Sequence, residues 1–91
     1  KLVRRPGKVD KNQSQLVAAM RKMGWKVISL APLGHGIPDL LAKPPGRPPV
    51  LLEVKDPSQP LSKQKLTPEQ AVFHSEWPVA VVRSIDDLLK L

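Results

Sequence analysis

Two acidic residues and one lysine stand at a spacing that can support chemistry. Asp39 follows a proline, and Glu53 and Lys55 lie further along the chain, with thirteen residues between the two acids and Val54 between Glu53 and Lys55. Side chains alternate between the two faces of a β-strand, so Glu53 and Lys55 point to one side and Val54 to the other. If the segments around Asp39 and Glu53 form paired strands, both carboxylates and the ammonium group converge.

A convergent pair of carboxylates favours a hard divalent cation. Two ionised carboxylates about 4 Å apart repel each other by roughly 4 kcal/mol at an effective dielectric constant near 20. A bound cation turns this repulsion into attraction. Oxygen ligands suit Mg²⁺, which keeps several of its waters, and such a water is a potential nucleophile. The alternative is that Glu53 and Lys55 form an exposed ion pair on a strand, without a catalytic role.

The first element expected around these residues is an amphipathic helix. Apolar residues recur at helical spacing over residues 12–23, and Gly24 follows where a helix can end. Asp10 is the expected N-cap. The apolar face is expected to consist of Leu16, Val17, Met20 and Met23.

Strands are expected in four short segments that are bounded by turn residues. Residues 31–38 form a loop in which Gly34 and Gly36 are expected to adopt positive φ. Residues 44–49 have proline at four of six positions and cannot donate ladder hydrogen bonds there, so they connect two strands. The expected strands cover residues 26–30, 39–43, 50–55 and 79–82.

A second helix starts with a strong sequence signal. Thr67 is the expected N-cap, Pro68 the first helical residue and Gln70 the partner in a capping box. This helix is expected to stop before Pro78, and a last short helix follows Ser84. The expected apolar side of the helix that begins at Thr67 consists of Val72, Phe73 and Trp77. The last helix contains Leu88 and Leu89. The order αβββαβα predicts an α/β fold with a four-stranded mixed sheet flanked by helices, in which Trp25 and Trp77 serve packing.

Composition narrows the class of protein. The 91 residues suit one domain, and the 27 Leu, Ile, Val and Phe residues are enough to form a core. The absence of cysteine excludes disulfide scaffolds, thiolate zinc sites and cysteine nucleophiles. No apolar run approaches the roughly 18 residues that span a bilayer, and no signal peptide opens the chain. We therefore expect a soluble, cytoplasmic protein without a membrane partner.

Positive charge is concentrated at the start of the chain. Lysine and arginine number 15 against 8 aspartate and glutamate residues, and five of these cations fall within residues 1–11. Such a basic arm suits DNA phosphates, and the single Phe, two Trp and absent Tyr argue against a platform that stacks single-stranded bases. A merely solvated terminus is the alternative. The candidate DNA contacts are Arg4, Arg5, Lys8 and Lys11, together with His35, Lys63 and Lys65.

The pattern Pro38-Asp39 followed by Glu53-Val54-Lys55 resembles the signature of the PD-(D/E)XK nuclease superfamily without a departure. The chain is also similar to the virus-type replication-repair nuclease (VRR-NUC) domain, particularly its compact phage-like members. This resemblance covers residues 10–91, in which four segments occur in the family's order: GIPDLL (36–41), LLEVKD (51–56), LTPEQ (66–70) and FHSEW (73–77).

This resemblance implies a single nuclease domain over residues 1–91 with a restriction-endonuclease-like αβββαβ core. It implies metal-dependent hydrolysis of DNA phosphodiesters, in branched DNA such as Holliday junctions. Asp39, Glu53 and the backbone carbonyl of Val54 would hold Mg²⁺ or Mn²⁺, and Lys55 would orient or deprotonate the attacking water. No nucleotide cofactor is expected, and a phage-encoded origin in a bacterial host fits the compact members. The alternative is a non-catalytic basic module that binds nucleic acid with the same fold.

Two glutamines and two histidines are polar residues outside the Asp-Glu-Lys pattern. In the family, Gln70 corresponds to a glutamine that reaches the active site, and Gln13 takes the place of a polar residue near the metal, a role that Asn12 could also fill. Both glutamines also suit capping boxes, which need no chemistry. We expect His35 to make a loop hydrogen bond or a phosphate contact and His74 to lie on a helix surface.

The resemblance also implies a symmetric homodimer, because stand-alone members of the family work as dimers and a junction must be cut in two strands related by a two-fold axis. A small domain also gains from burying a shared apolar face. The candidate interface residues are Met20, Met23, Leu88 and Leu89, with an ordinary intrachain core as the competing use of each.

Overall fold

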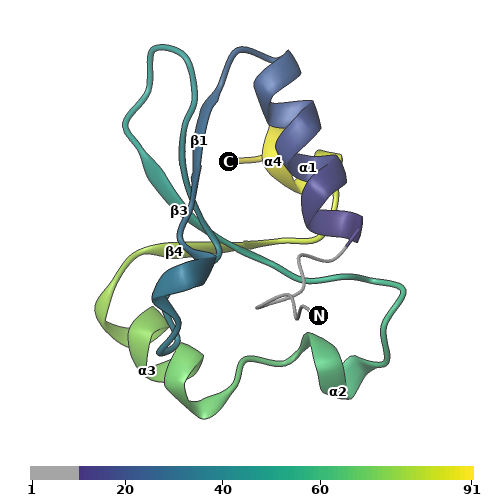
Figure 1. Ribbon diagram of the computed structural model, residues 1–91, viewed down its shortest axis with the longest axis vertical. Helices are drawn as coiled ribbons and strands as arrows, with labels where there is room; N and C mark the ends of the chain where they lie inside the picture. Colours follow the sequence, from purple (N-terminus) through teal and green to yellow (C-terminus); the bar gives the residue numbers. More distant parts are fainter. Residues whose placement is uncertain (1–10) are drawn as a thin grey trace, which may run out of the picture.

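The computed structural model describes residues 11–91, which form a four-stranded mixed sheet with helices (Figure 1). The strands lie in sequence order, and the first three pair antiparallel. The fourth strand pairs parallel to the third, so the chain between them must cross from one end of the sheet to the other. The strands are β1 (Lys26–Ser29), β2 (Leu40–Lys43), β3 (Val50–Val54) and β4 (Val79–Val82).

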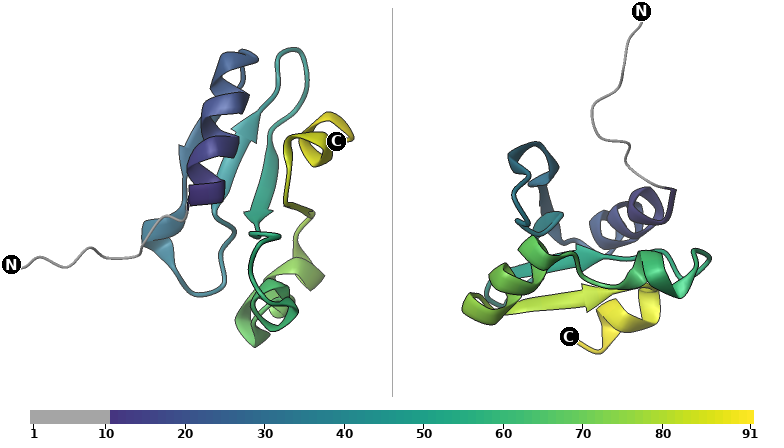
Figure 2. Two further views of the ribbon diagram at one scale, coloured as in Figure 1. Left: turned by 90° about the vertical axis from the view of Figure 1, so that its right-hand side faces the viewer. Right: turned by 90° about the horizontal axis from the view of Figure 1, so that it is seen from below.

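The helices divide between the two ends of the molecule. Figures 1 and 2 show α1 and α4 beside the upper part of the sheet, α1 next to β1 and α4 next to β4. Helices α2 and α3 lie below it in Figure 1, on the crossover between β3 and β4. These four helices are α1 (Lys11–Lys22), α2 (Leu61–Gln64), α3 (Pro68–Glu76) and α4 (Ile85–Leu89). The predicted mixed α/β order is confirmed.

Two short elements were not predicted. The polar segment after β3 contains α2, and the loop expected over residues 31–38 begins with a 3-10 helix, η1 (Ala31–Leu33). A single helical turn is too short to display hydrophobic periodicity, which is the signal from which longer helices are recognised. The predicted strands are otherwise confirmed, except that β1 and β3 end one residue earlier and Asp39 stands just before β2 rather than inside it.

The hydrophobic core lies between the sheet and α1. Leu16 and Met20 of α1 pack with Leu40 and Leu52 of the two central strands, and all four are at most 2% exposed. Leu88 of α4 joins the same cluster from the end of the chain. Because strand side chains alternate, the residues next to Leu40 and Leu52 point to the opposite face of the sheet.

Several apolar residues expected in the core are instead exposed. Met23 lies beyond the end of α1 and is 37% exposed, and Val72 and Trp77 are 59% and 53% exposed. The apolar side predicted for α3 is therefore wrong for those two residues, because only half-buried Phe73 packs there, with its ring stacked on Trp77 at 5.4 Å. Trp25 is buried, as expected.

The candidate dimer residues separate into two pairs. Met20 and Leu88 are fully buried in the intrachain core, so their proposed interface role is wrong and their competing use is correct. Met23 and Leu89 remain exposed.

Some predictions fall on residues outside the described range, namely the N-cap Asp10 and the DNA contacts Arg4, Arg5 and Lys8. Within residues 11–91, every helix is too short or too polar to cross a membrane.

The core predicts a large effect of truncating Leu52. We expect Leu52→Ala to lower the free energy of unfolding by about 2–5 kcal/mol, because the side chain is fully buried and its loss leaves a cavity. Urea unfolding measures this change. Leu61→Ala, at a position that is 79% exposed, is the matched control and should change stability by less than about 0.5 kcal/mol. Equal effects of the two substitutions would contradict this description of the core.

Candidate active site

The register of β2 and β3 brings the two predicted carboxylates together. Leu40 pairs with Leu52, and continuing this antiparallel register by one residue sets Asp39 opposite Glu53. The backbone N–H of Val54 donates a hydrogen bond of 2.7 Å to Asp39 Oδ2, which holds the aspartate against the end of β3. The backbone carbonyl of Asp39 also accepts a 2.8 Å bond from the N–H of Leu30, so the residue is fixed from both sides.

Glu53 is an acidic residue inside the protein. It is only 2% exposed, and this burial raises the pKa of its carboxyl from 4.5 to about 8, helped by the charge of Asp39 and a hydrogen bond between the two carboxyl groups, whereas Lys55 opposes the rise. A shared proton relieves the repulsion between two carboxylates that stand side by side. The alternative of an exposed Glu53–Lys55 ion pair is therefore excluded, because both residues are buried.

Gln70 connects the lysine with the glutamate. Its Oε1 lies 3.1 Å from the donor Nζ of Lys55, and its Nε2 donates at 3.1 Å to Glu53 Oε2. Lys55 Nζ itself lies 3.8 Å from the same Glu53 oxygen. The amide therefore orients both charged groups, with its oxygen toward the cation and its nitrogen toward the carboxylate.

The capping role of Gln70 is also confirmed. Its Oε1 accepts a 2.9 Å bond from the N–H of Thr67, and its own N–H donates at 3.1 Å to the Thr67 hydroxyl. The two roles considered for this glutamine are compatible, since one side chain closes the capping box and reaches the carboxylate. The start of α3 thus fixes the amide that orients the site.

His74 lies in the site rather than on the helix surface, so the sequence interpretation of this residue is wrong. It follows Gln70 by four residues on the same face of α3, and only 13% of its side chain is exposed. Its Nε2 stands 3.8 Å from Glu53 Oε1. Burial lowers the pKa of its imidazole, and the charge of Lys55 acts in the same direction. The four-residue spacing from Gln70 was the available sequence signal.

The first helix contributes two polar residues with different partners. Gln13 is 8% exposed and lines the same pocket as Asp39 and Glu53. Asn12 instead donates through Nδ2 to the backbone carbonyls of Lys55 at 2.8 Å and Arg83 at 3.2 Å. Asn12 therefore links α1 by hydrogen bonds to the residues that follow β3 and β4. Gln13 is the residue of α1 that lines the pocket.

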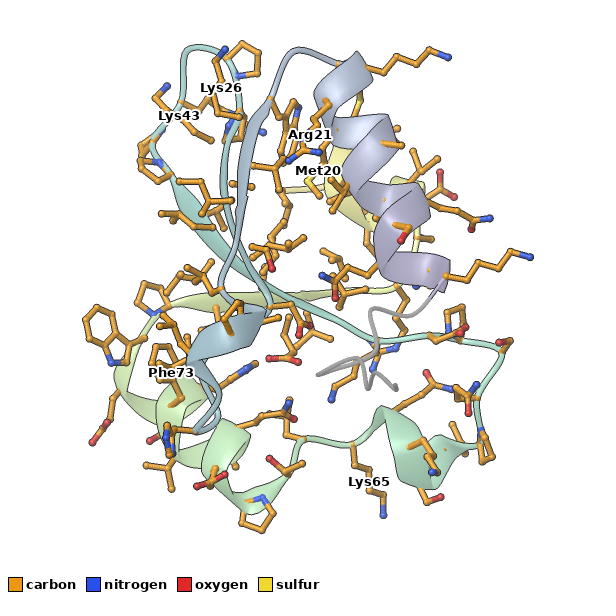
Figure 3. All side chains as sticks on the ribbon, viewed as in Figure 1. Met20, Arg21, Lys26, Lys43, Lys65 and Phe73 are labelled. Carbon is orange, nitrogen blue, oxygen red and sulfur yellow. The ribbon has the colours of Figure 1, made fainter. Side chains whose placement is uncertain are left out.

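The carboxylates, Lys55, Gln70 and Gln13 line a pocket of about 330 Å³. Of the basic residues proposed as DNA contacts, Lys63 on α2 lines it, whereas Lys11, His35 and Lys65 are exposed and do not. Lys65 projects away from the sheet (Figure 3). The lining residues are Gln13, Asp39, Glu53, Val54, Lys55, Asp56, Gln59, Lys63 and Gln70.

The loop before Asp39 approaches α3 closely, which requires glycine at position 36. Gly36 has φ of 78°, and a Cβ there would lie 2.6 Å from the backbone carbonyl of Glu69. Gly34 also has positive φ, as expected from the sequence, and so does His35 at 56°. Gly36 therefore allows the strand that carries Asp39 and the helix that carries Gln70 to meet.

Three other basic residues lie at the opposite end of the sheet. Lys26 and Lys43 occupy facing positions in β1 and β2, and Arg21 of α1 lies beside them, far from Phe73 of α3 (Figure 3). The guanidinium of Arg21 donates to the carbonyl of Val27 at 3.4 Å. These cations do not line the pocket, and among residues 11–91 the cations that line it are Lys55 and Lys63.

The donor set of the pocket is rich in oxygen. Within residues 11–91 no cluster of three or more His, Asp or Glu side chains is arranged to hold a metal ion. Asp39 and Glu53 line the pocket together with Val54. No protein-family model, curated protein or solved structure matches this chain.

The raised pKa of Glu53 predicts a pH-dependent stability in the absence of divalent cations. The folded state binds this proton more tightly than the unfolded state, so the free energy of unfolding falls as pH rises from about 4.5 to 8 and then levels off. Glu53→Gln removes the titrating group but keeps the shape. We expect this variant to exceed the original protein in stability by a few kcal/mol at pH 9, at about 1.4 kcal/mol per pKa unit, and to match it near pH 5.

Urea unfolding at both pH values, with a chelator present, measures this effect. Glu76→Gln, on the exposed side of α3, is the control and should leave the pH dependence unchanged. A constant difference between Glu53→Gln and the original protein at the two pH values would contradict the raised pKa.

Proposed function

We propose that this chain is a metal-dependent DNA endonuclease of the virus-type replication-repair nuclease family, with a restriction-endonuclease-like core. The observation that carries the proposal is the convergence of Asp39, Glu53, Lys55 and Gln70 in one pocket, at the ends of β2 and β3 and on α3. Those residues come from the separate motifs that resemble this family. The mixed sheet, with β4 parallel to β3 after a helical crossover, agrees with the expected core.

The residues of the pocket fit a divalent cation. Burial raises the pKa of the Glu53 carboxyl, and the charge of the neighbouring Asp39 adds to the rise. Two neighbouring carboxylates repel each other once both are ionised, and a divalent cation turns this repulsion into attraction. Asp39, Glu53 and the Val54 carbonyl would hold Mg²⁺ or Mn²⁺. The bound cation would supply an activated water and neutralise charge that develops on the phosphate.

The chain's own groups prepare the remaining chemistry. Lys55 is held beside Glu53 by Gln70, so its ammonium faces the place where a phosphate and its attacking water would lie. From there it orients the water and stabilises negative charge that develops on the phosphate. Asp39 is held by the Val54 N–H, which keeps its carboxylate directed toward Glu53.

The expected substrate is DNA, in duplex or branched form. The formal charge of +7 favours a phosphate backbone, and Lys63 lies at the pocket where a strand would pass. For a homodimer, which two coordinated cuts in a junction would need, Met23 and Leu89 are the candidate interface residues that remain exposed.

The proposed function is tested with labelled duplex, flap, single-stranded and four-way-junction DNA, in the presence of Mg²⁺, Mn²⁺ or a chelator. Cleavage is expected with either cation and none with the chelator. Binding of DNA without any product would favour the non-catalytic module instead.

Substitution of Lys55 separates chemistry from binding. We expect Lys55→Met to lower the cleavage rate by at least about 100-fold with little loss of DNA affinity, because this buried ammonium acts on the reacting groups whereas affinity comes mainly from surface cations. Single-turnover cleavage and a binding assay in chelator measure the two effects. Lys90→Met, at an exposed position on the last turn, is the control. Cleavage by Lys55→Met at a rate near that of the original protein would contradict this role.

Binding of a cation by Asp39 should stabilise the folded protein. We expect Mg²⁺ or Mn²⁺ to raise the melting temperature, since a tenfold excess over Kd contributes roughly 1.4 kcal/mol, or several degrees for a domain of this size. Asp39→Asn should lose most of this rise because it removes one anionic ligand. Thermal unfolding with and without the cation measures it, and Asp86→Asn on α4 is the control. The same cation-induced shift in Asp39→Asn and the original protein would exclude Asp39 as a ligand.

A further inference from the structure

The two oxygens of Glu53 face different residues of α3. Gln70 donates to Oε2, and His74, one helical turn later, directs Nε2 toward Oε1 at 3.8 Å. Residues four positions apart on a helix lie on the same face, so α3 contacts the carboxylate through both side chains. The Gln70 contact is a formed hydrogen bond, and the His74 contact is about 1 Å longer than a hydrogen bond should be.

Both atoms of the longer contact are buried and without a hydrogen-bond partner. Glu53 Oε1 and His74 Nε2 are the two side-chain polar atoms of the described residues that are in this condition. A buried donor or acceptor that stays unpaired destabilises the folded protein. Two such atoms that face each other can satisfy one another through a small turn of the carboxylate toward the ring.

We propose that His74 is a positioning residue for Glu53, in which the imidazole donates its Nε2–H to Oε1 and fixes the carboxylate in the orientation that binds a divalent cation. This inference rests on the proposed function, because the orientation matters only if Glu53 is a ligand. Carboxylate ligands of metals are themselves commonly held by hydrogen bonds from surrounding groups.

The surroundings of the ring favour a neutral donor over a charged one. The charged groups near the ring are Glu53, whose Oε1 lies 3.8 Å from Nε2, and Lys55. Burial lowers the pKa of His74, and the charge of Lys55 acts in the same direction, which favours the neutral form of the imidazole. A neutral donor holds the carboxylate without repelling the cation, which a second lysine at this position would do.

Two substitutions of His74 distinguish a hydrogen bond from simple packing. His74→Gln keeps an N–H donor close to the position of Nε2, whereas His74→Leu keeps the bulk and removes the donor. The affinity for Mn²⁺ is measured by calorimetry on the full chain without DNA. We expect His74→Leu to weaken Mn²⁺ binding by about 10–100-fold and His74→Gln to stay within about threefold of the original protein. Ser75→Ala, at the neighbouring exposed position, is the control.

The outcomes separate this inference from the proposed function. If the original protein and His74→Leu bind Mn²⁺ equally, the positioning role is overturned and the proposed function stands. If His74→Gln is as weak as His74→Leu, the hydrogen bond is overturned in favour of packing by the ring. If the original protein binds no Mn²⁺, the proposed function itself fails, and the role of His74 fails with it. Thermal unfolding in chelator checks that each variant is folded.

Discussion

The position of the Glu53 carboxyl group inside the protein, opposite Asp39, is the constraint on which the rest of the site depends. An acidic group that is 2% exposed must either keep its proton or meet compensating charge. Each neighbouring element supplies part of the compensation. The Val54 N–H holds Asp39, and Lys55 and Gln70 approach Glu53, yet Oε1 remains without a partner. His74 Nε2 faces this oxygen at 3.8 Å, and a cation in the pocket would offset the repulsion between the two carboxylates.

The register of the sheet links this site to the hydrophobic core. Leu40 and Leu52 face α1, so the residues adjacent to them, Asp39 and Glu53, face the other side. A slip of one residue between β2 and β3 would bury a carboxylate among aliphatic side chains and expose a leucine. The core thus determines where the carboxylates lie, and Val54 belongs both to the core and to the lining of the pocket.

The first turn of helix α3 is connected to the Glu53 carboxylate through Gln70. The Gln70 amide closes the capping box with Thr67 and also bridges Lys55 and Glu53, so movement of the helix start would move both charged groups. Gly36 permits the close approach that makes these contacts possible, since any larger residue would collide with Glu69. The crossover between β3 and β4 is therefore part of the site as well as a connection.

Local signals in the sequence determined most of the elements of this protein. Helical periodicity located α1, the residues Thr67 to Gln70 located the start of α3, and strand alternation set Glu53 and Lys55 on one face. Only the tertiary structure decided which groups are buried and what they contact. The exposure of Val72 and Trp77, the burial of Lys55 and the inward position of His74 depend on how α3 meets the sheet. Periodicity describes which residues share a face of one element, but it cannot say which other element, if any, covers that face.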